Sequence, residues 1–345
     1  MAIDTIQCLI ARSDSNPPYK SIQFRGSPSG QIVQKTFTYS LDDLASNEVI
    51  IKVTDSGLCF TDIHMLKKDM CLGHEGVGIV QAIGSDCKNV KVGCCEKCKF
   101  CLGQDNHYCK GVEWYGSHNT DSGSLSTFTK RKEAWLFKIP ASMPDTDAAP
   151  LMCGGASVWS PIIQNCHPFD RVGIIRIRGL GHLAIQTLRK MGCDIVVFST
   201  DELKCEEALS LGANEFHSVR GLKKDYGELG IEPVDMMFIS TSAKIPMGQL
   251  YPVMNPRSTI VLLTVDEGDL TLPYTQLVET GMTILGSSIA PRLEQILLLK
   301  ITENARNEVH VMAETFPLTL EDVNEAVEKL KSGKMRYCGV LVPKI

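Results

Sequence analysis

The sequence predicts a two-domain α/β protein in which one domain is built on a doubly wound parallel sheet. Its 345 residues are too many for one ordinary hydrophobic core and suit two. From about residue 156 onward, strand-like apolar runs alternate with helix-like segments, which is the pattern of a parallel sheet. Before that point, residues 49–53 read as a strand, and the hydrophobic fraction of 43% is that of a packed globular chain.

The alternation after residue 156 predicts each element from its own pattern. Helices have apolar residues at helical spacing, and buried strands are short continuous apolar runs. In chain order, we expect a helix at 156–165, a strand at 171–177, a helix at 183–191, a strand at 194–199, a helix at 206–213, strands at 234–239 and 259–265, and a strand at 282–285.

Composition excludes several classes of partner. The net charge is −5, whereas nucleic-acid binding needs a basic surface. No run approaches the roughly 18 apolar residues of a membrane span. Residues 1–4 have no basic start and lead into no long apolar run, so we expect no secretory signal and a cytoplasmic location. Thiols stay reduced there, so the 14 cysteines predict metal binding, catalysis or packing instead of disulfides.

Four cysteines have the spacing C-x2-C-x2-C-x7-C. Thiolates three positions apart can face one centre, and a fourth can complete a tetrahedron around Zn²⁺. A site with four protein ligands has no position for substrate, which predicts a structural zinc ion. Four unrelated cysteines and an iron–sulfur cluster are the alternatives. The cysteines are Cys95, Cys98, Cys101 and Cys109.

A second, dispersed set of zinc ligands is Cys59, His74 and Cys153. Three protein ligands leave a fourth position open for a substrate oxygen, as Lewis-acid chemistry requires. Taken singly, each residue has a plainer interpretation, because lone cysteines are often small buried hydrophobes. The four-cysteine loop that lies between them strengthens the interpretation as a catalytic metal site.

These features resemble the zinc-dependent medium-chain alcohol dehydrogenases, and in particular their cinnamyl-alcohol-dehydrogenase-like, fungal-type branch. The resemblance implies a GroES-like, partly β catalytic domain at 1–155 and 295–345, and a Rossmann domain at 156–294. It further implies two zinc ions per chain, NADP(H), a small-molecule substrate, neither nucleic acid nor membrane as partner, and a homodimer. Besides the cysteine loop, it rests on GLCFTDIH at 57–64, GHEGVG at 73–78, AAPLMCGG at 148–155, GLGHLAIQ at 179–186 and RYCGVLV at 336–342.

The resemblance also assigns roles around the catalytic zinc. Cys59, His74 and Cys153 match its ligands, and Glu75 matches the carboxylate that can approach the metal while ligands exchange. Thr61 matches the hydroxyl that takes the proton of the substrate oxygen. His64 matches the residue that passes this proton toward solvent, although both could be plain turn residues after a strand.

The turn after the first Rossmann strand departs from the expected G-x-G-x-x-G. Two arginines, Arg176 and Arg178, occupy the first two glycine positions, and Gly181 keeps the third. The second glycine ordinarily lets the backbone approach the pyrophosphate. Either the guanidinium groups swing aside or pair with the phosphates, or they fill the phosphate site and reduce cofactor binding.

The end of the second Rossmann strand favours NADP over NAD. An NAD site has an acid there, whereas this chain has Ser199, followed by Thr200 and Lys204. The family's NADP-type members have small hydroxyls and a lysine around the 2′-phosphate, although Asp201 would oppose that charge. Ser199 and Thr200 could instead cap the next helix. The resemblance adds as cofactor contacts Gly179, Leu180, Ser287 and Ser288.

A further departure is the shortened segment before the cysteine loop. The family usually has a strand and loop of roughly a dozen residues there, whereas Lys91-Val92-Gly93 directly precedes Cys94-Cys95.

Three functions remain open from the sequence. The first is a zinc-dependent NADP(H) alcohol dehydrogenase or aldehyde reductase. The second is a redox-silent enzyme, such as an isomerase, lyase or cyclase, that uses the zinc as a Lewis acid and has lost normal cofactor binding through Arg176 and Arg178. The third is a non-catalytic zinc protein, which the complete set of catalytic residues disfavours.

Overall fold

A computed structural model describes residues 18–87, 98–241, 245–264, 268–304 and 310–344. The chain divides into two compact units, which we describe separately: Met1–Met152 with Ala313–Ile345, and Cys153–Met312. The second unit extends past residue 294, where the sequence placed the end of the Rossmann domain, because it includes α8 (Arg292–Asn304). Among the described residues, no helix has the length and apolar character needed to cross a membrane.

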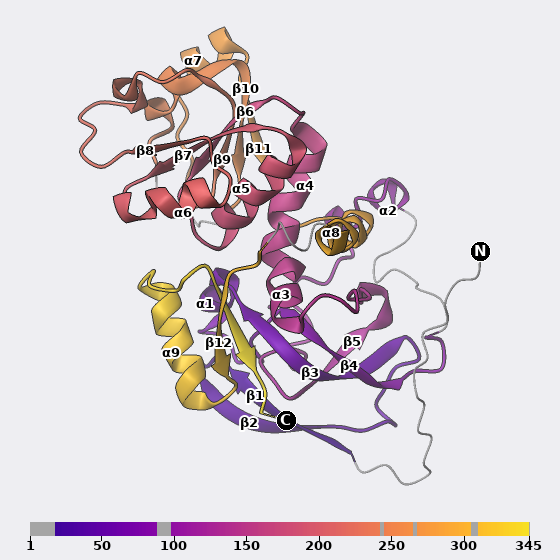
Figure 1. Cartoon of the computed structure of the whole chain (residues 1–345). Helices are drawn as coiled ribbons and strands as arrows, with labels where there is room; N and C mark the ends of the chain where they lie inside the picture. The colour runs from indigo at the N-terminus through magenta and orange to yellow at the C-terminus, as the bar shows by residue number, and fades with distance from the viewer. Residues whose placement is uncertain (1–17, 88–97, 242–244, 265–267, 305–309, 345) are drawn as a thin grey trace. The chain divides into compact units, whose positions relative to one another are not determined.

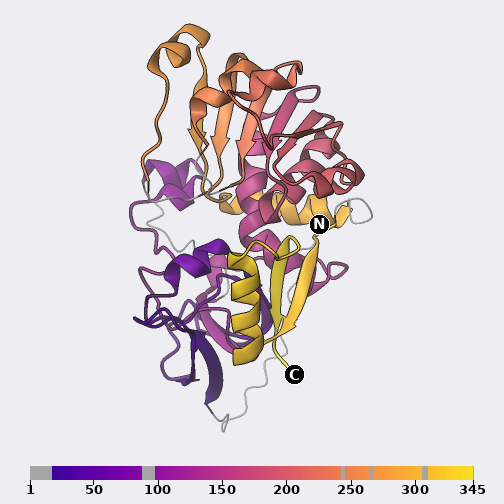
Figure 2. The ribbon, with the colours of Figure 1, turned by 90° about the vertical axis from the view of Figure 1, so that its left-hand side faces the viewer.

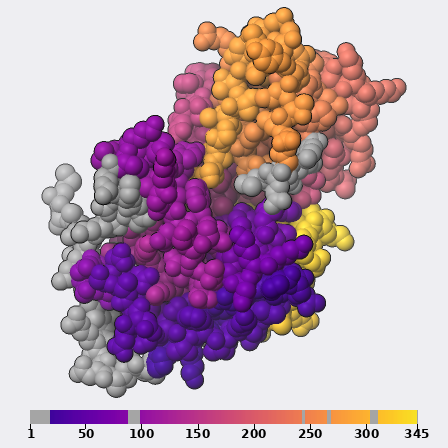
Figure 3. Space-filling model, turned by 180° about the vertical axis from the view of Figure 1, so that it is seen from behind, coloured from indigo at the N-terminus to yellow at the C-terminus, as the bar shows by residue number. Residues whose placement is uncertain are grey.

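The first unit is mainly β-structure (Figure 1). One sheet is the antiparallel pair β1–β2, and the other has the order β12-β13-β3-β4, with β5 also paired to β3. The last strands of the chain therefore complete a sheet that the early strands begin, and Figure 3 shows the yellow C-terminal segment against the indigo N-terminal one. The strands are β1 (Tyr19–Arg25), β2 (Val33–Tyr39), β3 (Glu48–Leu58), β4 (Glu75–Ile83), β5 (Phe128–Lys132), β12 (Ala313–Pro317) and β13 (Cys338–Val342).

Helix α9 (Leu320–Lys331) closes the core of the first unit. Thr319 caps it by accepting a hydrogen bond from the Asp322 amide. Its buried residues Val323, Ala326 and Val327 recur at helical spacing and so form one apolar face. This face packs with side chains from the sheets in one cluster, and Figure 2 shows the helix beside the C-terminal strands.

The second unit is a six-stranded parallel sheet in the order β11-β10-β9-β6-β7-β8. The first two crossovers run one way from β6 and the later ones run the other way, which is the doubly wound Rossmann order. The predicted fold class is thus confirmed. The order reverses between β6 and β9, at the switch point where such sheets bind ligands. The strands are β6 (Arg171–Ile175), β7 (Asp194–Ser199), β8 (Glu215–Ser218), β9 (Val234–Ile239), β10 (Met254–Leu262) and β11 (Thr283–Gly286).

Helices flank this sheet (Figure 2), and its central strands β6, β7 and β9 are mostly buried. Helix α5 begins at Gly179, earlier than the predicted Leu183, because its glycine-containing first turn lacks the apolar spacing that the later turns have. Gly192, in the left-handed conformation at φ 86°, ends it. Besides α8, the helices are α4 (Ala156–Asn165), α5 (Gly179–Met191), α6 (Cys205–Ser210) and α7 (Tyr274–Thr280).

His182 makes the stability of the second unit pH-dependent. Its ring is fully buried, and Nε2 accepts a hydrogen bond from the Met312 amide at 3.3 Å. Burial lowers the pKa of His182 from 6.5 to about 4. The unfolded chain therefore binds more protons between these values, so this contribution is complete above pH 6.5 and is lost toward pH 4.

We expect His182 to account for a loss of about 3 kcal/mol of unfolding free energy between neutral pH and pH 4. The variant His182→Leu should flatten the pH profile across this window, as measured by urea unfolding. The control His167→Gln changes an exposed histidine of the same unit and should leave the profile as it is. An unchanged slope in His182→Leu would contradict the prediction.

Candidate active site

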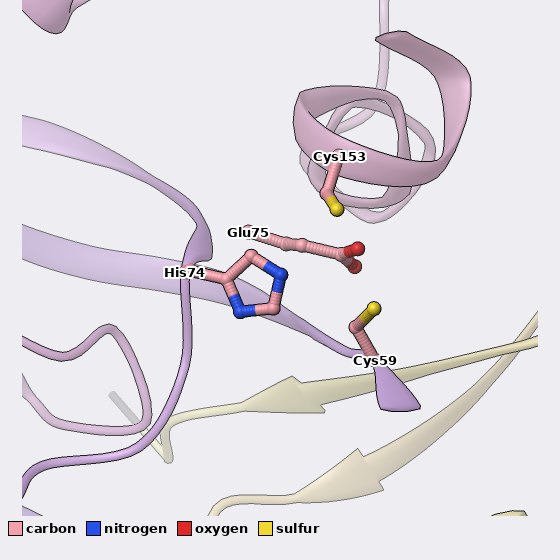
Figure 4. A group of neighbouring side chains, drawn as sticks. All are labelled: Cys59, His74, Glu75 and Cys153. Atoms are coloured by element: carbon pink, nitrogen blue, oxygen red, sulfur yellow. The ribbon is translucent and has the colours of Figure 1, made fainter. Parts of the chain in front are cut away.

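Four side chains that the sequence analysis singled out come together: Cys59, His74, Glu75 and Cys153. One ligand atom from each lies within 4.8 Å of the others. Figure 4 shows both sulfur atoms and the Glu75 carboxylate pointing into a common space, with one ring nitrogen of His74 facing it. Glu75 is buried and the other three are half-buried. Two thiols, an imidazole and a carboxylate around one point form a donor set that suits Zn²⁺.

The local folding of the chain explains how these residues meet. Cys59 directly follows β3 and caps the N-terminus of α1 (Phe60–Met65), and Glu75 begins β4, which pairs with β3. Gly57 lies opposite Glu75 in this pairing, and a Cβ atom there would lie 2.0 Å from the Glu75 carboxylate. Only glycine leaves room for that side chain. Cys153 lies in the π-helical turn Leu151–Gly155, within which the division between the two units falls.

Asp62 is a buried carboxylate that organises the site and that the sequence reasoning missed. Its Oδ2 accepts a hydrogen bond from the Cys59 amide at 3.0 Å. Its Oδ1 accepts one from the Gly73 amide at 3.0 Å and lies 3.2 Å from His74 Nδ1. Burial alone would raise the pKa of Asp62, but His74 and these hydrogen bonds hold it below its usual value. The carboxylate therefore stays ionised and fixes the orientation of the imidazole.

Tyr115 completes this arrangement from a distant part of the sequence. Its hydroxyl donates to Asp62 Oδ1 at 2.8 Å, and its ring lies 4.7 Å from the His74 ring, centroid to centroid. Burial and the neighbouring Asp62 charge hold the pKa of Tyr115 well above its usual value, so the hydroxyl remains a donor. Asp62 and Tyr115 thus hold His74 from two sides.

The two residues expected to carry a proton differ in position. Thr61 is half-buried, and its hydroxyl lies 3.6 Å from the Cys59 sulfur, at the edge of the four-residue group. His64 lies one helical turn further along α1 and is exposed to solvent. Phe60, between the ligand and Thr61, is also exposed.

A second cysteine cluster lies in the first unit. The ligand atoms of Cys98, Cys101 and Cys109 lie within 4.8 Å of one another, and the first two sulfur atoms are 3.4 Å apart. Cys98 precedes the short helix α2 (Lys99–Leu102), which turns Cys101 toward it. Cys95, the fourth predicted ligand, and the shortened segment before it lie outside the described residues.

Some of the expected cofactor residues gather at the turn between β6 and α5. The turn consists of Arg176, Ile177 and Arg178, and the helix begins with Gly179 and Leu180. The Lys204 ammonium donates a hydrogen bond to the Ile177 carbonyl at 2.7 Å. The others end or follow β7 and β11. Ser199 is buried and accepts a hydrogen bond from the Asp201 amide at 3.0 Å, while Thr200 is exposed. After β11, on the far side of the switch point, come Ser287 and Ser288.

Two family models match this chain. "Alcohol dehydrogenase GroES-like domain" matches residues 45–141, and "Zinc-binding dehydrogenase" matches residues 179–300. Together they cover more than half of the chain, and each falls largely within one of the two units.

Known proteins agree with these matches over nearly the whole chain. An alcohol dehydrogenase of Geobacillus stearothermophilus is 28% identical over 85% of this chain and 90% of its own length. A probable cinnamyl alcohol dehydrogenase 8A of Oryza sativa subsp. japonica is 28% identical over 90% of this chain and 91% of its own length. The structure of a CAD from Helicobacter pylori complexed with NADP(H) covers 94% of this chain and 99% of its own, with a TM-score of 0.83 at 21% identity.

Proposed function

Because the chain belongs to the zinc-dependent medium-chain alcohol dehydrogenases, on their cinnamyl-alcohol-dehydrogenase-like branch, we propose that it interconverts an alcohol and the corresponding carbonyl compound, using Zn²⁺ and NADP(H). The observation that carries the proposal is the convergence of Cys59, His74, Glu75 and Cys153. Bound there, Zn²⁺ supplies a Lewis acid, and NADP(H) supplies or accepts a hydride.

The side chains present fit a zinc ion. His74 Nε2 is buried and accepts no hydrogen bond from the described residues, while Nδ1 is engaged by Asp62. A histidine whose Nδ1 is held by a carboxylate while Nε2 faces two thiols is arranged as a metal ligand. We assign Cys59, His74 and Cys153 as ligands, and Glu75 as the carboxylate that can approach the metal during ligand exchange.

Proton movement is assigned to α1. The Thr61 hydroxyl lies beside Cys59 and can accept a proton from a substrate hydroxyl or return one to the product. His64 is exposed on the same helix and can exchange that proton with solvent.

The second unit is assigned to the dinucleotide. The turn keeps the backbone form that such a site needs, because Arg176 has the positive φ of 75° that glycine ordinarily supplies. Gly181 allows close packing of helix on strand, since a Cβ atom there would lie 2.3 Å from the Arg176 carbonyl oxygen. We assign cofactor contacts to this turn and to Lys204, Ser199, Thr200, Ser287 and Ser288.

Three further features are proposals of the same kind. Cys95, Cys98, Cys101 and Cys109 hold a structural zinc ion, for which the clustering of the last three is the support. The protein is a homodimer, as the family resemblance implies. It acts in the cytosol, as the character of residues 1–4 suggests.

The test is a turnover assay on zinc-loaded protein, with NADPH and a panel of aromatic and aliphatic aldehydes. We expect NADPH oxidation that depends on the aldehyde and that stops when a chelator removes the metal. Absence of NADPH binding together with absence of turnover would overturn the proposal. That outcome would favour the redox-silent Lewis-acid enzyme, for which the arginines in the phosphate turn are the specific observation.

A further inference from the structure

Three cationic side chains surround one three-residue turn in the second unit. Arg176 follows β6 directly, and Arg178 is the N-cap residue of α5. The Lys204 ammonium is held at this turn by its hydrogen bond of 2.7 Å to the Ile177 carbonyl. The three cations are thus contributed by segments that follow two adjacent strands, β6 and β7.

The turn lies at the switch point of the sheet. The Arg176 guanidinium donates through Nη1 to the Thr241 hydroxyl at 2.7 Å, and Thr241 follows β9. Strands β6 and β9 are the pair between which the strand order reverses. Ligands of doubly wound sheets bind outside the carboxyl ends of the strands at this point. The Arg176–Thr241 bond therefore fixes one cation at the mouth of the expected ligand site.

The two arginines differ from Lys204 in their charged neighbours, because Lys204 has the carboxylates of Glu207 and Asp201 near it. Neither arginine forms an ion pair in the described part of the chain, although both are half-buried. Burial lowers the pKa of Arg178, and the charge of Arg176 lowers it further. Burial likewise lowers the pKa of Lys204. Half-buried like charges destabilise a fold unless an anion joins them.

The first turn of α5 offers donors toward the same place. The side chain of the N-cap residue Arg178 makes no capping hydrogen bond to the amide groups of the first turn. Amides at a helix N-terminus attract phosphate, and guanidinium groups match its oxygens two at a time. The amides, two arginines and a lysine together suit a ligand with several phosphate charges.

We propose that this chain holds the diphosphate of NADP(H) with the side chains of Arg176 and Arg178, where the fold ordinarily uses bare glycine backbone. This inference rests on the proposed function, because NADP(H) supplies the diphosphate. Binding of the diphosphate then depends on the charge of these side chains, whereas at a glycine turn it depends on the close approach of the backbone to the diphosphate. Consequently a return to glycine weakens binding, and salt weakens binding in the native chain more than in the charge-depleted one.

The test compares three variants at Arg178 by titrating the zinc-loaded full chain with NADPH and following its fluorescence. Arg178→Gln removes the charge and should raise the dissociation constant about 10- to 100-fold. Arg178→Lys keeps the charge and should retain most of the affinity, whereas Arg178→Gly should lose at least as much as Arg178→Gln. The control Arg220→Gln changes an exposed arginine of the same unit and should bind as the native chain does.

A second measurement varies the salt concentration. The dissociation constant of the native chain should rise more steeply with added KCl than that of Arg178→Gln, because one charged contact is gone from the variant. Inorganic diphosphate should compete with NADPH more strongly in the native chain than in the variant. Equal salt slopes and equal competition would contradict the inference.

The outcomes separate this inference from the proposed function. Tighter NADPH binding in Arg178→Gly than in the native chain overturns the inference, since the arginine would then obstruct the site. No NADPH binding to the native chain, or binding indifferent to charge at this position, also overturns it. Aldehyde turnover together with NADPH binding that is indifferent to this charge, or that tightens in Arg178→Gly, leaves the proposed function standing, whereas no NADPH binding overturns both. Charge-dependent binding without any turnover supports the inference and overturns the proposed function.

Discussion

Replacing Cys153 by alanine is expected to release one metal ion per chain and to lower kcat/KM for aldehyde reduction by about a thousandfold or more. The remaining Cys59 and His74 would supply only two strong ligands. Loss of a Lewis acid that stabilises the transition state by several kcal/mol corresponds to a rate loss of about this size. Elemental analysis of the purified variant, together with the turnover assay, measures both quantities.

The matched control is Cys205→Ala, which removes a half-buried cysteine that belongs to neither cluster. Its metal content and activity should equal those of the native chain. In Cys153→Ala, any metal held by the cluster of Cys98, Cys101 and Cys109 should remain, so the loss is confined to one ion. Full activity in a Cys153→Ala protein that has lost this ion would refute the catalytic role of the metal.

Replacing Asp62 by asparagine is expected to weaken zinc binding at the first site by about 10- to 100-fold. The amide keeps the size of the side chain but removes the charge that orients and polarises His74. In the native chain, both carboxylate oxygens accept hydrogen bonds from backbone amides, those of Cys59 and Gly73. In the variant, an NH2 group replaces one of these oxygens, so two donors face each other there. Competition with a zinc chelator of known affinity measures the change.

Two further variants make the Asp62 result specific. Asp42→Asn removes an exposed carboxylate of the same unit and should leave zinc affinity unchanged. Tyr115→Phe removes only the hydroxyl that donates to Asp62 and keeps the ring beside His74, so a smaller loss is expected. Zinc affinity in Asp62→Asn equal to that of the native chain would show that the buried carboxylate does not position the ligand.

Much of the fold could be predicted because the second unit has clear periodicity. The helix at 156–165 and the strands at 194–199 and 234–239 were predicted with the bounds that the structure has. Buried parallel strands give short continuous apolar runs, and these are hard to mistake when turns bound them. The start of α5 could not be placed this way, because glycines in its first turn favour no helix.

The site was only partly predictable for a different reason. Candidate metal ligands are recognisable by residue type, so Cys59, His74 and Cys153, which the structure brings together, could be proposed one by one. Asp62 stands in the same motif, but its role depends on contacts with Gly73, His74 and Tyr115. Its spacing from Cys59, which forms a capping box, was the one local signal. The contact with Tyr115 leaves no trace in sequence periodicity.

The place of β13 in the first sheet has a consequence for the order in which the protein assembles during synthesis. Strand β13 (Cys338–Val342) pairs with β3, and β3 leads directly into Cys59, one of the proposed zinc ligands. The ribosome makes β3 early, and β4 and β5 can pair with it soon afterwards. Residues 56–58 of β3, however, lack their β13 partner until residue 342 has left the exit tunnel. The Rossmann unit is complete well before then. We therefore expect the nascent chain to fold its second unit first and to acquire the catalytic metal last.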